Sequence, residues 1–160
     1  MIDTRGPSLQ ERFAARSICF GCGPANAHGL QLRSFRAPAP TAGLIASFTP
    51  QPFHHAFPGV LNGGICGALL DCHANWAACI HLMDRDGLDA PPCTVTADFH
   101  VTLRRPTPMD APLALAAHVV ESSGPRALVE ATITAGGKVT ANCRGTFVAV
   151  GEGHPAFHRW

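Results

Sequence analysis

The pattern of hydrophobic and polar residues predicts one long helix followed by several strands. Between residues 63 and 83 apolar residues recur at spacings of three and four, which is typical of a helix. From residue 94 onward the spacing changes to two, and alternating runs predict strands over 94–105, 113–121, 127–135 and 138–150. The short turns between the later runs indicate antiparallel neighbours.

The chain before this helix has shorter elements and more turns. We expect an amphipathic helix over 8–17 and strands over 30–36 and 43–49. The prolines of 50–59 predict a loop. One long helix between two early strands and four later ones indicates an α+β fold, in which an antiparallel sheet wraps around a single buried helix.

The predicted long helix is apolar almost all round, but its faces differ in side-chain size. A stripe that can pack on the sheet consists of bulky residues: Ile65, Leu69, Cys72, Trp76, Ile80 and Met83. A second stripe, small enough to let another backbone approach, consists of Gly64, Gly67, Ala68, Ala74 and Ala78, with Asp71 among them. Burying a carboxylate is costly unless something pairs with it or uses it, so Asp71 is a candidate functional residue.

The start of this helix is a second candidate feature. Asn62, Gly63 and Gly64 are expected to leave the first helical N–H groups uncovered, and these groups suit a carbonyl oxygen or an oxyanion. Gly64 and Asp71 are roughly 10 Å apart along the axis at ~1.5 Å per residue, so one carbonyl cannot reach both in one chain. Two antiparallel copies of the helix would solve this, which predicts an isologous dimer with shared sites.

A structural alternative stays open for the same residues. Asn62 can be an ordinary N-cap, and Gly63 and Gly64 can form a tight entry to the helix. Asp71 can then be an acid that a neighbouring loop satisfies.

Composition limits the classes of protein that fit. The 160 residues suit one domain, and a formal net charge of +1 gives no general case for binding nucleic acid or an anionic membrane. No apolar run approaches the ~18 residues of a transmembrane helix, and the N-terminus lacks the apolar region of a secretory signal. The seven cysteines fit reduced, buried thiols in a cytoplasmic protein.

Four longer stretches follow one another along the chain: CFGCGPANAHGLQLRSF, HHAFPGVLNGGICGALLDCHANWAA, FHVTLRRPTP and GGKVTANCRGTFVAV. Together they resemble the hot-dog-fold acyl-CoA thioesterases, and the phenylacetate-degradation type is the most similar branch. The resemblance implies a hot-dog domain over 19–150, an N-terminal helical extension over 1–18 and a C-terminal tail over 151–160. It also implies a dimer, often paired into a tetramer.

The resemblance implies roles for residues of the long helix. That family's helix typically opens with His-Gly-Gly, and an acid follows nine positions after the His. Here these positions are held by Asn62, Gly63, Gly64 and Asp71. Asp71 is then the general base or nucleophile of thioester hydrolysis, and the Gly64 N–H polarises the carbonyl of a substrate shared with the partner chain. The chain departs from the family at Asn62, and at Cys72, where many relatives have Glu.

Substrate-binding candidates come from two segments. The loop before the helix contributes His54, which aligns with a His often seen in the family, and Gly59. A later strand contributes four residues near its two ends: Thr94, Thr96, Arg104 and Arg105. The arginines suit the phosphates of coenzyme A, although a solvated strand end explains them equally well. In relatives, a hydroxyl from the region of the threonines helps to place the attacking water.

Cysteine chemistry offers two other interpretations. Cys19 and Cys22, with His28 nearby, have the spacing of a zinc half-site, but no second pair with suitable spacing follows, so no metal is expected. We interpret this run as a turn whose thiols pack or line the pocket entrance. No Gly-x-Ser-x-Gly motif is present, and Cys72 is expected to be an inert thiol that points towards the sheet. His73 is expected to be structural or to lie at an interface.

The sequence therefore predicts a thioester hydrolase that acts on small to medium acyl- or aryl-CoA thioesters. It would need no cofactor beyond the coenzyme A of its substrate and would assemble as a homodimer or homotetramer. A non-catalytic protein that binds acyl-CoA or another apolar ligand is the main alternative. An enoyl-thioester hydratase is a further one, although the helix offers no clear Asp and His pair for it.

Overall fold

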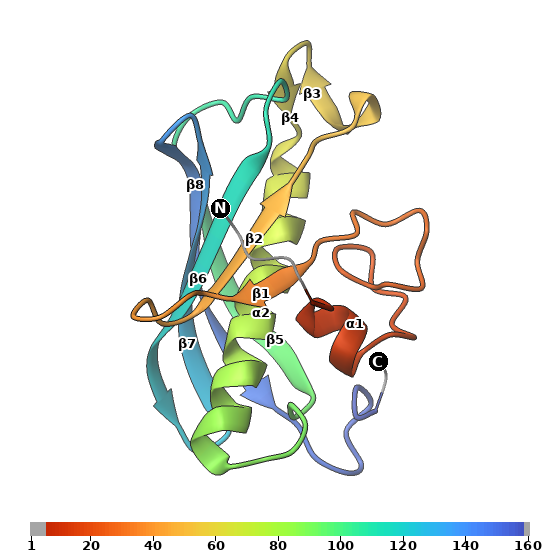
Figure 1. The fold of residues 1–160 in the computed structure, drawn as a ribbon, viewed down its shortest axis with the longest axis vertical. Helices are drawn as coiled ribbons and strands as arrows, with labels where there is room; N and C mark the ends of the chain where they lie inside the picture. The colour runs from red at the N-terminus through yellow and green to blue at the C-terminus, as the bar shows by residue number, and fades with distance from the viewer. Residues whose placement is uncertain (1–5, 159–160) are drawn as a thin grey trace.

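An antiparallel sheet curves around one long helix in the computed structural model, which describes residues 6–158 (Figure 1). The sheet has six strands in the order β1-β2-β6-β7-β8-β5, and every neighbouring pair is antiparallel. Their bounds are β1 Ser34–Arg36, β2 Leu44–Phe48, β5 Thr94–Leu103, β6 Leu113–Ser123, β7 Arg126–Ala135 and β8 Lys138–Ala149. The predicted α+β fold is confirmed. Residues 1–5 of the predicted N-terminal extension and 159–160 of the predicted tail lie outside the described residues.

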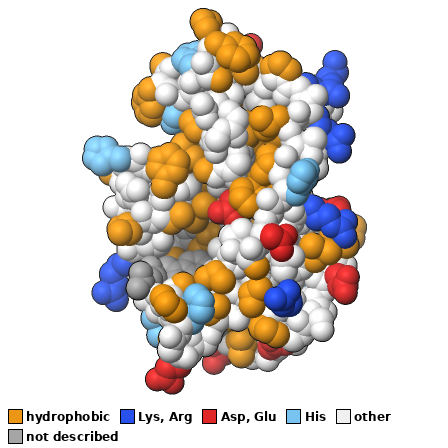
Figure 2. All heavy atoms as spheres, turned by 180° about the vertical axis from the view of Figure 1, so that it is seen from behind, with side chains coloured by type: hydrophobic (Ala, Val, Ile, Leu, Met, Phe, Trp, Pro, Cys, Tyr) orange, Lys and Arg blue, Asp and Glu red, His pale blue; other side chains and the backbone are white. Residues whose placement is uncertain are grey.

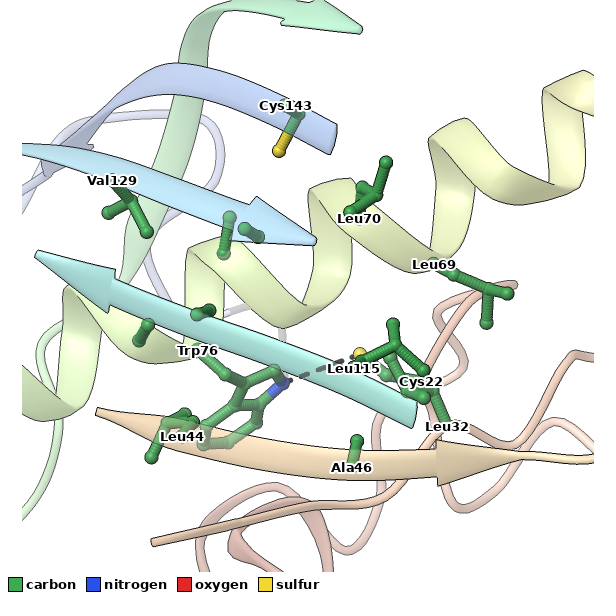
Figure 3. Packing of buried hydrophobic residues seen from close by; sticks show 14 of the residues in the cluster. Cys22, Leu32, Leu44, Ala46, Leu69, Leu70, Trp76, Leu115, Val129 and Cys143 are labelled. Carbon is green, nitrogen blue, oxygen red and sulfur yellow. Dashed lines mark hydrogen bonds between the residues drawn. The ribbon is translucent and has the colours of Figure 1, made fainter. Parts of the chain in front are cut away.

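The central helix α2 runs over Gly63–Asp86, three residues further than the predicted end at Met83. Gly87 ends it in the left-handed conformation, with φ of 64°, which glycine adopts without steric cost. The helix packs against β5, β6, β7 and β8. Figure 3 shows Leu69, Leu70 and Trp76 of α2 in the hydrophobic cluster that the sheet and the N-terminal segment complete. Among the described residues no helix combines the length and apolar character of a membrane span.

The small-residue stripe of α2 is only partly open, which corrects the expectation for its C-terminal half. Ala74 and Ala78 are fully buried in the core of the same chain. The sheet therefore covers more of the helix circumference than predicted, because short side chains let its curved backbone approach. The part that is left half-buried or exposed comprises Gly64, Gly67, Ala68 and Asp71, and the half-buried Asn75 continues it. We call these five residues the open stripe.

The strand β5 does not bury the apolar face that its alternation suggests. Ala97 is exposed, and Phe99 and Leu103 are 38% and 56% exposed. A bulge between Thr96 and Asp98 interrupts the register with β8, which shifts the alternation. In addition, β5 is the last strand of the sheet, so an apolar surface lies at the sheet edge.

The N-terminal segment differs most from its prediction. Helix α1 covers only Leu9–Phe13, because the chain turns after Ala14, whose backbone leaves the helical conformation. It is fixed at its start by a capping box between Ser8 and Glu11. The strand expected over 30–36 is shortened to β1, since Leu32 donates its N–H to the carbonyl of Gly21 instead of to a strand.

The expected loop over 50–59 also contains regular structure. It holds the 3-10 helix η1 over Pro52–His54 and the strand β3 over His55–Phe57. This strand pairs with β4, Val60–Leu61, in a small second sheet. Gly59 forms the turn between them, with φ of 80°. The hairpin leads the chain directly into α2.

A buried polar chain ties the N-terminal segment to the middle of α2. The Gln10 side chain donates to Ser34 Oγ at 3.0 Å, and Ser34 Oγ lies 2.9 Å from His73 Nδ1. His73 Nε2 lies 3.3 Å from the carbonyl of Leu44, which can only accept, so Nε2 carries a proton. His73 is thus a structural residue, one of the two roles expected for it.

Burial lowers the pKa of His73 from 6.5 to about 4, and this predicts a loss of stability in acid. The unfolded chain takes up a proton on this ring before the folded chain does, so the stabilising contribution is complete above pH 6.5 and falls away as the pH decreases towards 4. We expect the wild type to lose up to about 3 kcal/mol of unfolding free energy from this group. Urea unfolding of wild type and His73→Gln across this interval measures it. Equal pH slopes for the two proteins would contradict the assignment.

Candidate functional site

Asp71 lies on the open stripe of α2 and lines a pocket. The pocket has a volume of about 340 Å³ and lies between α2, the start of β5 and the N-terminal segment. Its walls are Ser17, Ile18, Cys19, Cys22, Asp71, Cys72, Asn75, Trp76, Thr94 and Ala156. Within the part of the chain that the structure describes, no histidine lines it. The described residues therefore do not form, in this pocket, the Asp and His pair that would favour a hydratase.

The carboxylate of Asp71 is held by a hydroxyl from β5. Thr96 Oγ1 donates a hydrogen bond of 2.7 Å to Asp71 Oδ1, whereas Thr94 donates to Asn75. Thr96 directly precedes the bulge of β5. The sequence could not tell which threonine would serve the acid, and the geometry favours Thr96.

Two opposing effects set the charge of this carboxyl group. Burial raises the pKa of Asp71 above its ordinary value, and a charge on Cys19 acts in the same direction. The hydrogen bond from Thr96 lowers the pKa, since it stabilises the carboxylate. A half-buried carboxylate with one fixed donor is a stronger base than an exposed one.

The start of α2 is covered, which corrects the expectation of free N–H groups. Asn62 Oδ1 accepts from the N–H of Gly64 at 2.8 Å and from that of Ile65 at 3.3 Å. Asn62 is therefore the N-cap that the structural alternative required. For the Gly64 N–H to bind a carbonyl oxygen, the Asn62 side chain must turn away.

The two arginines lie near this helix start. They follow β5, whose last residue Leu103 lies so close to α2 that a β-carbon added to Gly63 would be 2.8 Å from it. The backbone N–H groups of Arg104 and Arg105 both donate to the carbonyl of Thr140, which fixes this corner. Both side chains are exposed. Arg104 Nε donates to Asn142 Oδ1 of β8, and this side chain lines a surface pocket with Glu130 and Arg144, so it lies along the sheet.

The two loop candidates lie outside the pocket of Asp71. His54 is buried, stacks on Phe48 at 5.6 Å between ring centroids, and accepts from the Gln51 N–H. Its carbonyl accepts from the Asn62 N–H at 2.9 Å. The carbonyl of Gly59 accepts from Met109. These residues hold the hairpin and the helix start in place rather than approaching Asp71.

Cys19 and Cys22 line the pocket, which is one of the two expectations for their turn, whereas the expectation for Cys72 is wrong. Cys72 does not point towards the sheet. Its Sγ lies 3.6 Å from that of Cys19, on the pocket wall, and Cys22 is beside them. Asn75 and Trp76 also line the pocket. The spacing of Asn75 from Asp71, four residues along one helix, was the available signal for Asn75.

Comparison with known proteins places the fold. No protein-family model and no curated protein sequence matches the chain. A thioesterase-superfamily protein of Shewanella loihica is 30% identical, with 80% of this chain and 98% of that chain covered and a TM-score of 0.62. A phenylacetic acid degradation-related protein of Ralstonia eutropha is 18% identical over 81% of this chain and 92% of its own, with a TM-score of 0.63. A Bacillus halodurans protein solved with CoA is 21% identical over 77% and 76%, with a TM-score of 0.60.

The first of these similarities shows the superfamily, and the other two show the fold alone. The predicted hot-dog arrangement, a sheet wrapped around a central helix, is confirmed. The similarity does not establish the roles of the site residues, because proteins that share a fold can differ in function.

The cap of α2 predicts a difference between two replacements of Asn62. Asn62→Ala removes the acceptor for two N–H groups and should lower the free energy of unfolding by about 1 kcal/mol. Asn62→Asp keeps the acceptor and adds a negative charge at the positive end of the helix dipole, so it should be at least as stable as the wild type. Urea unfolding at neutral pH compares the three proteins. If Asn62→Ala is as stable as the wild type, the cap contributes nothing.

Proposed function

Because the chain belongs to the thioesterase superfamily, we propose that it hydrolyses small to medium acyl- or aryl-CoA thioesters, with Asp71 as the acid–base or nucleophilic group. The observation that carries the proposal is the position of Asp71. It is a half-buried carboxylate on the open stripe of the central helix, hydrogen-bonded by Thr96 and lining a pocket. An acid in an otherwise apolar helix is explained when a substrate uses it.

Thioester hydrolysis needs only a few catalytic groups, because the thioester carbonyl is already activated towards nucleophiles. In one route Asp71 takes a proton from water, and the water oxygen attacks the thioester carbonyl carbon. In the other route the Asp71 carboxylate attacks this carbon directly, which gives an anhydride that water hydrolyses in a later step. The tetrahedral intermediate collapses, the carbon–sulfur bond breaks, and the thiolate of coenzyme A leaves and takes up a proton. The base supplies ~10²–10⁴-fold and each oxyanion donor ~10²–10³-fold in rate.

A second copy of the chain supplies the oxyanion donor in this proposal. Asp71 and Gly64 lie roughly 10 Å apart along one helix, so the two must come from different chains to meet at one carbonyl. Two features support such an approach. A β-carbon added to Gly67 would meet no atom within 4 Å, so a partner backbone can approach the open stripe there. Hydrophobic side chains also gather along the middle of the face seen in Figure 2, with acidic ones among them.

The phosphates of coenzyme A are assigned to Arg104 and Arg105. These side chains are exposed, follow the end of β5 and can each form two hydrogen bonds to a phosphate. The CoA in the Bacillus halodurans structure shows that a protein of the same fold binds this cofactor. His54 and Gly59 act in this proposal through the hairpin that positions the helix start.

A second candidate function is favoured by one observation, the cap on Gly64. The Gly64 N–H already donates to Asn62 Oδ1 at 2.8 Å, so the chain can hold an acyl-CoA without polarising the thioester carbonyl. The protein would then be a non-catalytic binder of acyl-CoA. Release of free thiol separates the two functions.

Replacement of Asp71 tests the proposed hydrolysis. Asp71→Asn keeps the size of the side chain and removes the base, so kcat for thiol release from acyl-CoAs should fall by ~10²–10⁴-fold. The control Asp89→Asn changes an exposed acid after α2 and should retain activity. Equal turnover by wild type and Asp71→Asn would make Asp71 structural. Saturable acyl-CoA binding without turnover by the wild type would establish the non-catalytic function.

Replacement of the two arginines tests the coenzyme A site. Arg104→Gln combined with Arg105→Gln should raise KM for acyl-CoA by about tenfold or more, since charged hydrogen bonds to phosphate contribute about 1.5–3 kcal/mol. KM for the matching N-acetylcysteamine thioester, which has no phosphate, should stay unchanged. Arg126→Gln, at an exposed position on β7, is the control. Equal effects on both substrates would indicate a structural role instead.

A further inference from the structure

Three cysteine sulfurs meet at one wall of the pocket, although they come from two segments of the chain. Cys19 and Cys22 belong to the turn before β1, and Cys72 belongs to α2. Their Sγ atoms all lie within 4.8 Å of one another. Among residues 6–158, this is the one group of three or more His, Cys, Asp or Glu side chains whose ligand atoms are close enough to share a metal ion.

The distances between the sulfurs match shared coordination better than a covalent bond. In a tetrahedral zinc site each Zn–S bond is about 2.3 Å, which places two sulfur ligands about 3.8 Å apart. Cys19 Sγ and Cys72 Sγ are 3.6 Å apart. A disulfide would need about 2.05 Å. Little movement is therefore needed for these sulfurs to bind one ion.

The surroundings of the sulfurs suit thiolates. The indole N–H of Trp76 points towards Cys22 in Figure 3 and donates to its Sγ at 3.4 Å. The backbone N–H groups of Gly21 and Cys22 donate towards Cys19. Such outer donors orient metal ligands and stabilise their charge. The turn also wraps closely around the third sulfur, since a β-carbon at Gly21 would overlap Cys72 Sγ.

We propose that Cys19, Cys22 and Cys72 form a binding site for a thiophilic divalent cation of the Zn²⁺ type. Binding forms three Zn–S bonds and releases the remaining thiol protons to solvent, with no oxidant or reductant. Zinc sites with three protein ligands leave a fourth position for water or substrate. Because the three cysteines and Asp71 line one pocket, that position is accessible from the pocket. The site does not depend on the proposed hydrolysis.

The charges in the cluster agree with this assignment. Hydrogen bonds from the thiols of Cys22 and then Cys72 lower the pKa of Cys19. The hydrogen bond to Cys19 raises the pKa of Cys22 to about 12. A hydrogen bond with Cys19 is also the largest cause of the raised pKa of Cys72. A dication bound by the three thiolates would neutralise two of their three negative charges.

Cobalt substitution tests the site on the full chain. The protein is reduced, freed of metal with a chelator and titrated with Co²⁺ without oxygen, and the expected result is one equivalent with thiolate-to-cobalt charge-transfer and tetrahedral d–d absorption. Zn²⁺ should displace the cobalt. Cys19→Ser, at an exposed position, and Cys72→Ser should each weaken Zn²⁺ binding by more than the ~10–100-fold that loss of an outer-shell partner costs.

Cys93→Ser is the control, because it removes a half-buried thiol outside the cluster and should leave metal binding unchanged. Circular dichroism checks each variant, and Cys19→Ser decides if Cys72→Ser does not fold. The proposal is wrong if the wild type shows no cobalt–thiolate absorption, or if Cys19→Ser binds Zn²⁺ as the wild type does. It is also wrong if the reduced protein binds no zinc while air oxidation joins Cys19 to Cys72, which would make the pair a redox couple.

Discussion

The fold depends on covering a helix that is apolar almost all round. The sheet curves about α2 and buries Leu69, Leu70 and Ala74 completely, and the N-terminal segment covers another side through Cys22 and Leu32. One chain does not cover the whole circumference, so the open stripe is left. Asp71 lies on this stripe, where its carboxylate avoids full burial and still lines a pocket. The same geometric limit therefore gives the protein a stable core and a candidate site.

Much of the fold could be predicted because its main elements are long and periodic. The spacing of apolar residues identified α2, and the alternation over β6, β7 and β8 with short turns between them identified the antiparallel order. The N-terminal segment could not be predicted as well. Its conformation depends on distant partners, such as the bond from Leu32 to Gly21 and the chain from Gln10 through Ser34 to His73. Local patterns carry no information about such contacts.

The candidate site was predictable in its residue types and less so in its contacts. Asp71 could be found because an acid in an apolar helix is costly. That Thr96 and not Thr94 donates to Asp71 could not be predicted, because the bulge beside Thr96 has no signal in the local sequence. Asn62 as a cap was one of two open alternatives, and only the side-chain rotamer decides between them. Cys72 was misplaced because the sheet covers the alanine side of α2, which turns this thiol towards Cys19 instead.

In the proposed active site, Asp71 of one chain works with the start of α2 of another. Subunit complementation tests it most directly, using Asp71→Asn and Gly64→Pro, which removes an N–H group in the first helical turn together with its bond to Asn62. Each variant alone should be inactive in thiol release. Mixed in equal amounts and allowed to exchange subunits, they should recover about a quarter of wild-type activity, because half of the dimers are mixed and each has one complete site. Mixed dimers that form without recovering activity would contradict the shared site.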